Sequence, residues 1–394
     1  MQYNFEILPD RRLTESSKWQ AYDEDVLPLP VADMDFLSPQ PVIDALRQRS
    51  EHGVFGYPED IHGKSPLVVS LRTAFLERLE RLYGWKVDSQ ALVLMPGVVP
   101  GLNLACQALA QPGGGVLIQT PVYPPFLYLA HNANAKPQIS PLYRDPDGRY
   151  GVDWDAFGAA FTQETRLFVL CNPHNPVGRV YLPSELEKMA SVCLERGVTI
   201  VADEIHCDLI YPGHRHIPIA TLDPEIAQHS ITLMAPSKTF NLAGLNCSFA
   251  IIPSPKLRRK FIHARQGLVG GVNVMGLVAA QAAYRLGQDW LDQLLVYLRA
   301  NRDFLVEFVQ HELPGISMFC PEGTYLAWLD CTQALLSESP YEFFLNQARV
   351  ALAEGKTYGV GGEGFVRLNF GCSRLVLEQA LQRMKLALQA FHGR

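Results

Sequence analysis

The sequence contains no CxxC pair, since its eight cysteines are scattered along 394 residues. Scattered thiols fit a reducing compartment better than a disulfide framework, so we expect free cysteines and a cytoplasmic protein. The first stretch of the chain lacks the apolar core of a signal peptide, which points the same way. The longest apolar run, 267–283, is interrupted by Asn273 and several glycines, and it predicts a buried helix rather than a membrane span.

An excess of charge of one sign is also lacking. The formal net charge is -6, with 48% hydrophobic and 19% charged residues, which is the composition of an ordinary globular protein. Such a chain has no basic surface for nucleic acid or for an anionic membrane. Its partners are therefore expected to be small molecules or other subunits, and we predict no metal site.

Two nucleotide-binding motifs are missing. The G-x-G-x-x-G fingerprint is absent after the apolar run 92–94. Gly355-Lys356-Thr357 looks like the end of a P-loop, but Val350 stands where that motif has its first glycine. Nucleotide hydrolysis is rejected on this ground.

What the sequence does contain is an alternation of short apolar runs and helical patterns. Runs that are apolar throughout are typical of strands buried on both faces, as in a mostly parallel sheet covered by helices. The predicted strands are 92–94, 116–118, 167–170, 198–201, 231–234 and 249–252.

These strands define the predicted organisation, an α/β fold with two domains. A large domain spans about 47–285, and a small α+β domain combines the N-terminal arm, 1–46, with 286–394. Within the small domain the pattern predicts a helix ending near Arg302, a second helix at 303–312, strands at 325–329 and 365–370, and a terminal helix at 374–391. Ligands of such sheets bind beyond the carboxyl ends of the strands.

Lys238 follows the predicted strand 231–234 in a short polar segment between two apolar runs. Burial disfavours the ammonium form and lowers the pKa, which makes the amine a nucleophile able to form a Schiff base with an aldehyde. The alternative is a lysine that extends its ammonium to the surface, and for an isolated lysine this is the commoner outcome. The neighbouring strand ends decide between the two.

Two strand ends indicate a flat, phosphorylated ligand. Gly97, Val98 and Val99 lie between a strand and a helix expected to open near Pro100, where exposed amides bind a phosphate. Tyr123 ends the next strand and can lay its ring over a flat ligand, although an aromatic that only covers the sheet is about as common.

Two further strand ends carry an amide and a carboxylate. Asn175 can donate a hydrogen bond to an anionic oxygen, and Asp203 needs a cationic partner because an unpaired buried charge is costly. A pyridinium nitrogen is such a partner. Together with Ser237 and Lys238, these side chains indicate one cofactor, pyridoxal phosphate.

The same residues resemble a known family, the fold-type I pyridoxal-phosphate enzymes of aminotransferase class I/II. Within it the chain resembles the bacterial cystathionine β-lyase, or C-S lyase, subgroup. The resemblance is carried by NPHNPVG at 172–178, DEIH at 203–206, SKTFN at 237–241, DMDF at 33–36, GVFGY at 53–57 and FVRLN at 365–369. It implies a seven-stranded type of sheet and a homodimer with a shared active site.

The resemblance also implies roles for the cofactor-binding residues. Lys238 would form the Schiff base, Asp203 would face the pyridine nitrogen and Asn175 the ring hydroxyl. Tyr57 would reach the cofactor phosphate of the partner subunit. Where many aminotransferases have a tyrosine, this chain has His206, whose role stays open between a hydrogen bond to Asp203 or the ring hydroxyl and ordinary packing.

Substrate binding and phosphate binding follow from the same comparison. Arg367 would bind the substrate α-carboxylate, because a planar guanidinium pairs with it bidentately, and Val31 and Ala32 would lie beside the substrate. Asn246 replaces a phosphate-binding arginine of many relatives. Phosphate binding is therefore expected from backbone amides, Ser237 and Tyr57.

The implied reaction is α,β-elimination of cystathionine or a related L-cysteine thioether to a thiol, pyruvate and ammonia. Lys238 would be the base, and Lys238, Tyr123 or Tyr57 would protonate the leaving sulfur. An aminotransferase uses the same residues, because reaction choice depends on the geometry around Lys238. A cofactor-binding regulatory protein is a third interpretation.

Overall fold

The structure is a computed structural model that describes residues 2–58 and 65–393. Its centre is an eight-stranded sheet in the order β2-β9-β8-β7-β6-β3-β4-β5. The strands are β2 (Leu92–Met95), β3 (Gly115–Thr120), β4 (Lys136–Arg144), β5 (Tyr150–Val152), β6 (Thr165–Cys171), β7 (Thr199–Asp203), β8 (Ser230–Met234) and β9 (Ser248–Ile251).

Five of these strands, β3, β4, β6, β7 and β8, run parallel to one another, and β9 is antiparallel to β2 and β8. This confirms the predicted mostly parallel sheet. Two strands were not predicted, β4 and β5, which pair antiparallel at one edge. Most side chains of β4 are exposed or half-buried, and it contains Pro137 and Pro141, so it lacks the apolar run of a central strand.

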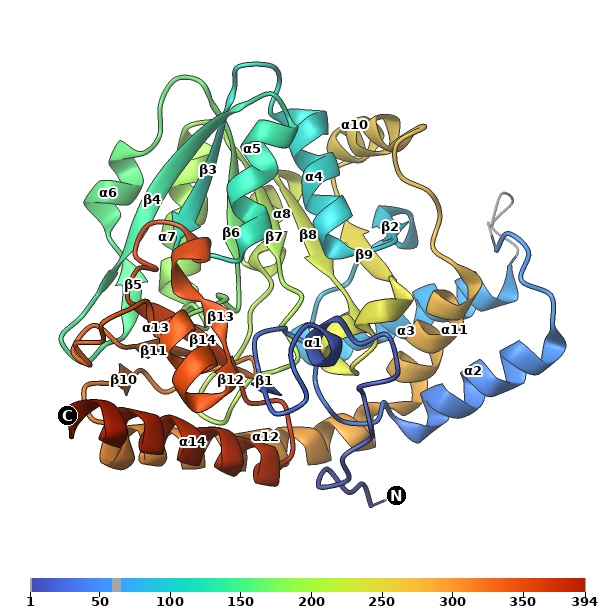
Figure 1. The fold of residues 1–394 in the computed structure, drawn as a ribbon. Coiled ribbons are helices and arrows are strands. Elements are labelled where there is room, and N and C mark those ends of the chain that lie inside the picture. Colours follow the sequence, from blue (N-terminus) through green and yellow to red (C-terminus); the bar gives the residue numbers. More distant parts are fainter. Residues whose placement is uncertain (1, 59–64, 394) are drawn as a thin grey trace.

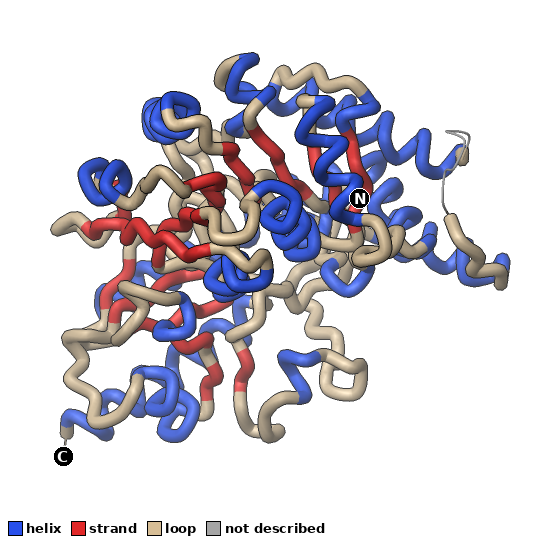
Figure 2. Tube along the Cα trace, turned by 90° about the horizontal axis from the view of Figure 1, so that it is seen from above, coloured by secondary structure: helices blue, strands red, loops and turns tan. Residues whose placement is uncertain are grey.

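Helices cover both faces of this sheet because its buried residues alternate between two cores. Val116 and Ile118 pack with α4 (Val98–Leu109) and α10 (Pro255–Arg265), whereas Leu117 packs with α7 (Pro183–Glu195). Figure 2 shows the strands, in red, between helices on either side.

The remaining helices surround this core and the N-terminal arm. Apart from α4, α7 and α10, the α-helices of the described residues are α1 (Ser17–Gln20), α2 (Gln40–His52), α3 (Pro66–Tyr83), α5 (Leu129–Asn132), α6 (Trp154–Ala159), α8 (Pro224–Gln228), α9 (Pro236–Thr239), α11 (Val274–Leu286), α12 (Gln288–Glu312), α13 (Pro340–Phe343) and α14 (Arg374–His392). None of the helices in the described residues is long and apolar enough to cross a membrane.

A second, four-stranded sheet lies in the C-terminal part, in the order β10-β11-β14-β13. Its strands are β10 (Ser317–Met318), β11 (Leu326–Asp330), β13 (Ala353–Glu354) and β14 (Phe365–Asn369). The long helix α12 runs beside α14 below this sheet (Figure 1). The predicted break at 302–303 was wrong, because α12 contains no glycine or proline and its buried leucines continue across that point.

The N-terminal arm joins the two parts. Strand β1 (Leu27–Pro28) pairs in parallel with β12 (Val350–Ala351), and Figure 1 shows the dark-blue arm beside β12. The arm then passes the carboxyl ends of the large sheet, where Ala32 lines a cavity. The predicted domain limits at 47 and 285 stay a prediction, and the first of them falls inside α2.

Candidate active site

A cavity of about 290 Å³ lies where the strands of the large sheet end. The carboxyl ends of parallel strands meet at one edge, so side chains far apart in sequence converge there. The cavity brings together most of the residues singled out from the sequence: Ala32, Gly97, Val98, Val99, Tyr123, Asn175, Asp203, His206, Ser237 and Lys238.

Lys238 lies on the short helix α9, which follows β8 and begins at Pro236. Its amine points into the cavity rather than out to solvent, and Nζ donates a hydrogen bond of 2.6 Å to the backbone carbonyl of Ala32. Burial, and then the positive charge of Arg367, lower its pKa to about 8, against the opposing effects of Asp33 and Asp203. A substantial fraction of the amine is therefore neutral near physiological pH, as a nucleophile requires.

The phosphate cradle begins at Gly97, whose φ of +147° favours glycine. Helix α4 starts at Val98, two residues before the predicted start, because Pro100 is tolerated within a first helical turn. The amides of Val98 and Val99 have no partner inside the helix and open on the same cavity as Ser237. This arrangement suits a phosphate group.

Asp203 ends β7 and is 5% exposed. Burial raises its pKa to about 7, while a hydrogen bond from the Ile205 amide, 3.1 Å, and the charge of Lys238 act in the opposite direction. Among residues 2–58 and 65–393, no side-chain cation lies within ion-pair distance of it. A cationic ring nitrogen is the kind of partner that this carboxylate lacks.

Arg367 on β14 lies beside the cavity and is 3% exposed. It donates to Oδ1 of Asn175 at 2.9 Å and to the carbonyl of Pro30 at 2.6 Å, and its Nε has no partner. Because the Asn175 oxygen accepts from Arg367, its amide nitrogen is left to donate elsewhere. The ring of Tyr358 lies under the guanidinium, 5.3 Å from its centroid.

His206 lines the cavity and is buried, and burial holds its pKa well below the usual range, so its imidazole is neutral. Its Nδ1 has no partner, and the ring stands edge-on to Tyr325 with 5.9 Å between centroids. No hydrogen bond joins it to Asp203 in the described part of the chain. Of the roles predicted for His206, a hydrogen bond to the ring hydroxyl and ordinary packing are left.

Besides Arg367, two predicted residues do not line the cavity. Tyr57 is 99% exposed, so the structure does not bring it to Lys238 of the same chain. Val31 is also exposed, although its carbonyl accepts a hydrogen bond of 2.6 Å from Asn369.

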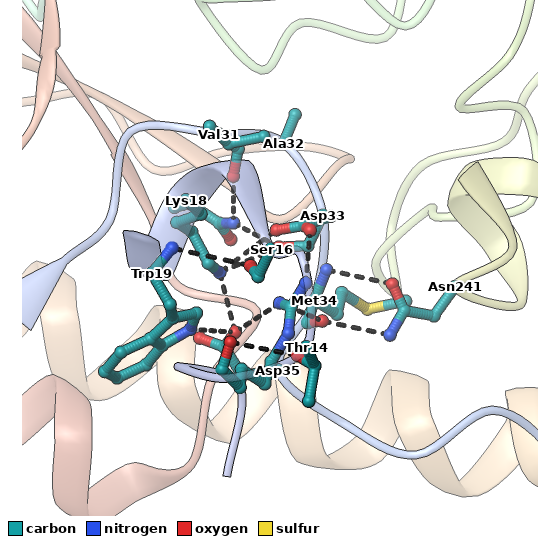
Figure 3. Close-up of polar contacts among 12 residues, drawn as sticks. Thr14, Ser16, Lys18, Trp19, Val31, Ala32, Asp33, Met34, Asp35 and Asn241 are labelled. Carbon is teal, nitrogen blue, oxygen red and sulfur yellow. Dashed lines mark hydrogen bonds and ion pairs between the residues drawn. The ribbon is translucent and has the colours of Figure 1, made fainter. Parts of the chain in front are cut away.

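Sequence reasoning missed a buried ionic cluster in the arm. Lys18 is 0% exposed and pairs with Asp33 Oδ1 at 3.2 Å and Asp35 Oδ1 at 2.8 Å, and Arg11 pairs with both carboxylates. Figure 3 shows Lys18 directed at the two aspartates, the Trp19 indole directed at Asp35, and Asn241 against Met34. The only signal in the sequence was the DMDF segment, since nothing in the arm shows that Lys18 is buried.

Two more residues near Lys238 were missed, Tyr325 and Asn369. The Tyr325 hydroxyl donates to the Ala32 carbonyl at 2.9 Å. The Asn369 amide donates to the carbonyls of Val31 and Asp33, both at 2.6 Å. Asn369 lies two residues after Arg367 on β14, so both side chains point to the same face of that strand.

Fold and site together define a protein of the fold-type I pyridoxal-phosphate class. The family model described as aminotransferase class I and II matches residues 24–384, and the chain belongs to this family.

Some proteins of similar sequence and structure are named as lyases, and others are named as aminotransferases. The chain is 40% identical to cystathionine β-lyase PatB of Bacillus subtilis (strain 168), over 98% of this chain and 100% of that protein. It superposes on the pyridoxal-phosphate-bound C-S lyase of Staphylococcus hominis with a TM-score of 0.91 at 33% identity, covering 98% and 99% of the two chains. Cystalysin of Treponema denticola, which contains pyridoxal 5'-phosphate, gives a TM-score of 0.93 at 30% identity, covering 99% and 100%.

Proposed function

We propose that the chain is a pyridoxal-phosphate-dependent C-S β-lyase that cleaves cystathionine or a related L-cysteine thioether to a thiol, pyruvate and ammonia. The observation that carries the proposal is the Lys238 amine, with a pKa lowered to about 8, held in one cavity with Asp203 and beside Arg367. The names of the similar proteins support the same class of reaction.

The residues present fit the cofactor. Val98, Val99 and Ser237 would hold the phosphate, Tyr123 the ring face, and Asp203 the ring nitrogen. When bound, the cofactor supplies an electron-accepting ring that stabilises a carbanion at the substrate α-carbon.

Lys238 is the proposed base. Its free amine rests on the Ala32 carbonyl, and a neutral amine there can remove the α-proton, a step worth about 10² to 10⁴ in rate. Arg367 would orient the substrate carboxylate, and its hydrogen bonds to Asn175 and Pro30 support this role because they fix the guanidinium before any ligand binds.

The leaving thiolate needs a proton donor. Burial raises the pKa of Tyr123, with Arg367 opposing, so its phenol stays protonated at neutral pH and can donate. Lys238, protonated after removing the α-proton, is a second donor from this chain, and Tyr57 of the partner subunit is a third.

A homodimer with a shared site is part of the proposal. The segment 54–57 contains three hydrophobic side chains that are each more than half exposed, Val54, Phe55 and Tyr57. Such a cluster of exposed hydrophobic side chains is unusual unless another protein surface covers it. A cytoplasmic location is proposed from the cysteines, all eight of which are free thiols in the structure.

Incubation with cystathionine tests the reaction. The lyase releases pyruvate and a new thiol in equal amounts without a keto-acid acceptor. The family's own description makes aminotransferase the second candidate, and amino transfer that depends on a keto acid, with no free thiol, would replace the lyase proposal.

A Lys238→Ala variant tests the role of the lysine itself. It should lose the visible band of the bound cofactor and the thiol release, whereas Lys356→Ala should keep both, because Lys356 is an exposed lysine paired with Glu354. Retention of thiol release in Lys238→Ala would reject the role of Lys238, whereas absence of turnover in the unaltered protein would favour a regulatory protein.

A further inference from the structure

The arm crosses the cavity between Pro30 and Phe36, and most backbone carbonyls of this segment accept hydrogen bonds from side chains. Side chains from three other parts of the chain, together with Arg11 and Lys18 of the arm itself, make these hydrogen bonds, so the arm is fixed at several points along its length. The accepted carbonyls and their donors are Pro30 with Arg367, Val31 with Asn369, Ala32 with Lys238 and Tyr325, Asp33 with Asn369 and Lys18, Met34 with Arg11 and Asn241, and Phe36 with Asn241.

The Ala32 carbonyl differs from the others because one of its two donors is the Lys238 amine. Tyr325 donates at 2.9 Å and Lys238 Nζ at 2.6 Å, which together use both lone pairs of the oxygen. The Tyr325 side chain is 1% exposed and has no freedom to follow the amine. Tyr325 therefore sets the direction from which this oxygen meets Lys238.

Asn369 fixes the carbonyls on either side of Ala32. Its amide nitrogen donates to Val31 and Asp33 at 2.6 Å each, while its oxygen accepts from the Gly371 amide at 2.8 Å. All polar atoms of the side chain are thus engaged, and two peptide planes are held at once. The peptide of Ala32 lies between these fixed points.

Behind this segment, the ionic cluster holds the arm from the other side. Lys18 pairs with Asp33 and Asp35 and donates to the Asp33 carbonyl at 3.3 Å (Figure 3). Two cations, Arg11 and Lys18, balance two carboxylates, so the cluster is neutral as a whole. Its role in the arrangement is to fix the arm without adding net charge near Lys238.

We propose that Tyr325 and Asn369 are positioning residues for the Lys238 amine: they hold the Ala32 carbonyl so that the amine, whenever it is not bonded to the cofactor, rests at one defined place. This inference rests on the proposed function, since only an enzyme that repeatedly releases Lys238 needs a resting place for it. Proton abstraction is faster when the base is held within hydrogen-bond distance of its target than when the base moves among many positions.

The charges around the amine determine how a change in this contact would be observed. Lys238 faces Arg367 from β14, Asp33 from the arm and Asp203 from β7, and the neutral His206 lies in the same cavity. None of these groups is altered by removing the Tyr325 hydroxyl. A change in the titration of Lys238 after that removal therefore reports on the shared carbonyl.

The test uses cofactor-free protein and pyridoxal 5'-phosphate as the probe, without substrate. Only the neutral amine adds to the aldehyde carbon, with loss of water, so the pH dependence of the rate at which the visible band appears reports the titration of Lys238. In Tyr325→Phe the carbonyl is left to the amine alone, which favours the ammonium. The midpoint of the pH dependence of this rate should therefore rise by about half a pH unit. At pH 7 the cofactor would then bind to Lys238 about three times more slowly.

The matched control is Tyr211→Phe. Tyr211 is also 1% exposed and donates its hydroxyl to a backbone carbonyl, that of Thr324 at 2.7 Å, next to Tyr325 but not at Lys238. Tyr211→Phe thus loses a hydrogen bond from a tyrosine hydroxyl to a backbone carbonyl, as Tyr325→Phe does, and the carbonyl is that of the residue before Tyr325. The proposal is overturned if the two variants have the same midpoint.

A second pair tests Asn369. In Asn369→Ala the arm loosens and the Ala32 carbonyl is no longer held on the amine, so the midpoint should fall by about half a unit, opposite to the shift in Tyr325→Phe. Asn301→Ala is its control, because Asn301 also donates to two carbonyls, of Phe370 and Cys372, at 3.2 and 2.8 Å. Equal midpoints in Asn369→Ala and Asn301→Ala would overturn the role of Asn369.

The outcome separates this inference from the proposed function. If the unaltered protein captures no cofactor on Lys238, as read by reduction with borohydride and peptide mapping, the cofactor assignment fails. If capture is normal and thiol release from cystathionine is absent, the lyase proposal fails while the midpoints still decide the role of Tyr325.

Discussion

Arg367 and Asn175 are joined by a hydrogen bond of 2.9 Å from guanidinium to side-chain oxygen, although 192 positions separate them in the chain. The bond connects the residue proposed for the substrate carboxylate with the residue proposed for the cofactor ring. Each thereby restricts the orientation of the other before any ligand arrives. A substitution at one should therefore affect functions assigned to both.

Arg367→Lys tests this coupling. Lysine keeps the positive charge but lacks the planar guanidinium with its several donors. It therefore cannot bind Asn175, the Pro30 carbonyl and a carboxylate at the same time. A lost hydrogen bond to a charged group is worth about 1.5 to 3 kcal/mol, so kcat/KM for a thioether should fall about 10- to 100-fold. Steady-state kinetics with cystathionine measure this.

Its control is Arg349→Lys, which changes a surface arginine paired with Asp23 and Asp25. That variant should keep kcat/KM within about twofold, because exposed ion pairs contribute about 0 to 1 kcal/mol and lie far from the chemistry. Equal losses in the two variants would contradict the assignment of Arg367.

Asp203 should make the cofactor-free protein less stable as pH rises. Its pKa of about 7 lies above that of an unfolded aspartate, so the folded state holds a proton that the unfolded state has released. Stability is then full at acidic pH and falls between about pH 4 and 7, by at most about 1.4 kcal/mol per pH unit for this one group. Thermal unfolding of apoprotein between pH 5 and 8 measures it.

Asp203→Asn provides the comparison, since an amide has no proton to lose. The melting temperature of the variant relative to the unaltered apoprotein should increase from pH 5 to pH 8. Added pyridoxal 5'-phosphate should reverse the order at pH 8, because the ring nitrogen pairs only with the carboxylate. A difference that does not vary with pH would argue that Asp203 is already ionised without a partner.

Lys18→Met should be strongly destabilising. Methionine has a similar volume but carries no charge. The buried Asp35 and its neighbour Asp33 would then have Arg11 as their one cationic partner in this cluster. Breaking a buried pair by removing one partner costs about 3 to 5 kcal/mol. Urea unfolding should show this loss, whereas the surface variant Arg349→Met should lose about 1 kcal/mol or less. Similar losses in the two would contradict the assignment of Lys18 as an anchor of the arm.

Tyr57 tests the shared site. Tyr57→Ala and Lys238→Ala should each have low activity as pure proteins. When the two are unfolded together and refolded, mixed dimers carry one site with both native residues, so about a quarter of all sites should be restored. Recovery after mixing, followed as thiol release, would not occur if Tyr57 acts within its own chain or not at all.

The positions of six strands and the residues at their ends could be predicted from the sequence, because buried parallel strands are continuous apolar runs with polar residues directly after them. The runs at 92–94, 116–118, 167–170, 198–201, 231–234 and 249–252 all became strands of the large sheet. Strand β4 could not be recognised, since its half-exposed, proline-containing stretch has no such signature. The division of α12 into two helices was wrong because the segment around 302–303 contains no glycine or proline to end a helix, and the buried leucines continue past it.

By itself, the sequence determined the class of fold, the convergence of Lys238, Asp203, Asn175 and Gly97 at one sheet edge, and the kind of cofactor that this set of groups suits. These features depend on local patterns, on strand period and on the residue types required by the chemistry. The tertiary structure decided which partners fix them. The burial of Lys18 and the sharing of the Ala32 carbonyl between Lys238 and Tyr325 arise from contacts between segments up to about 300 residues apart, and no local pattern encodes such contacts.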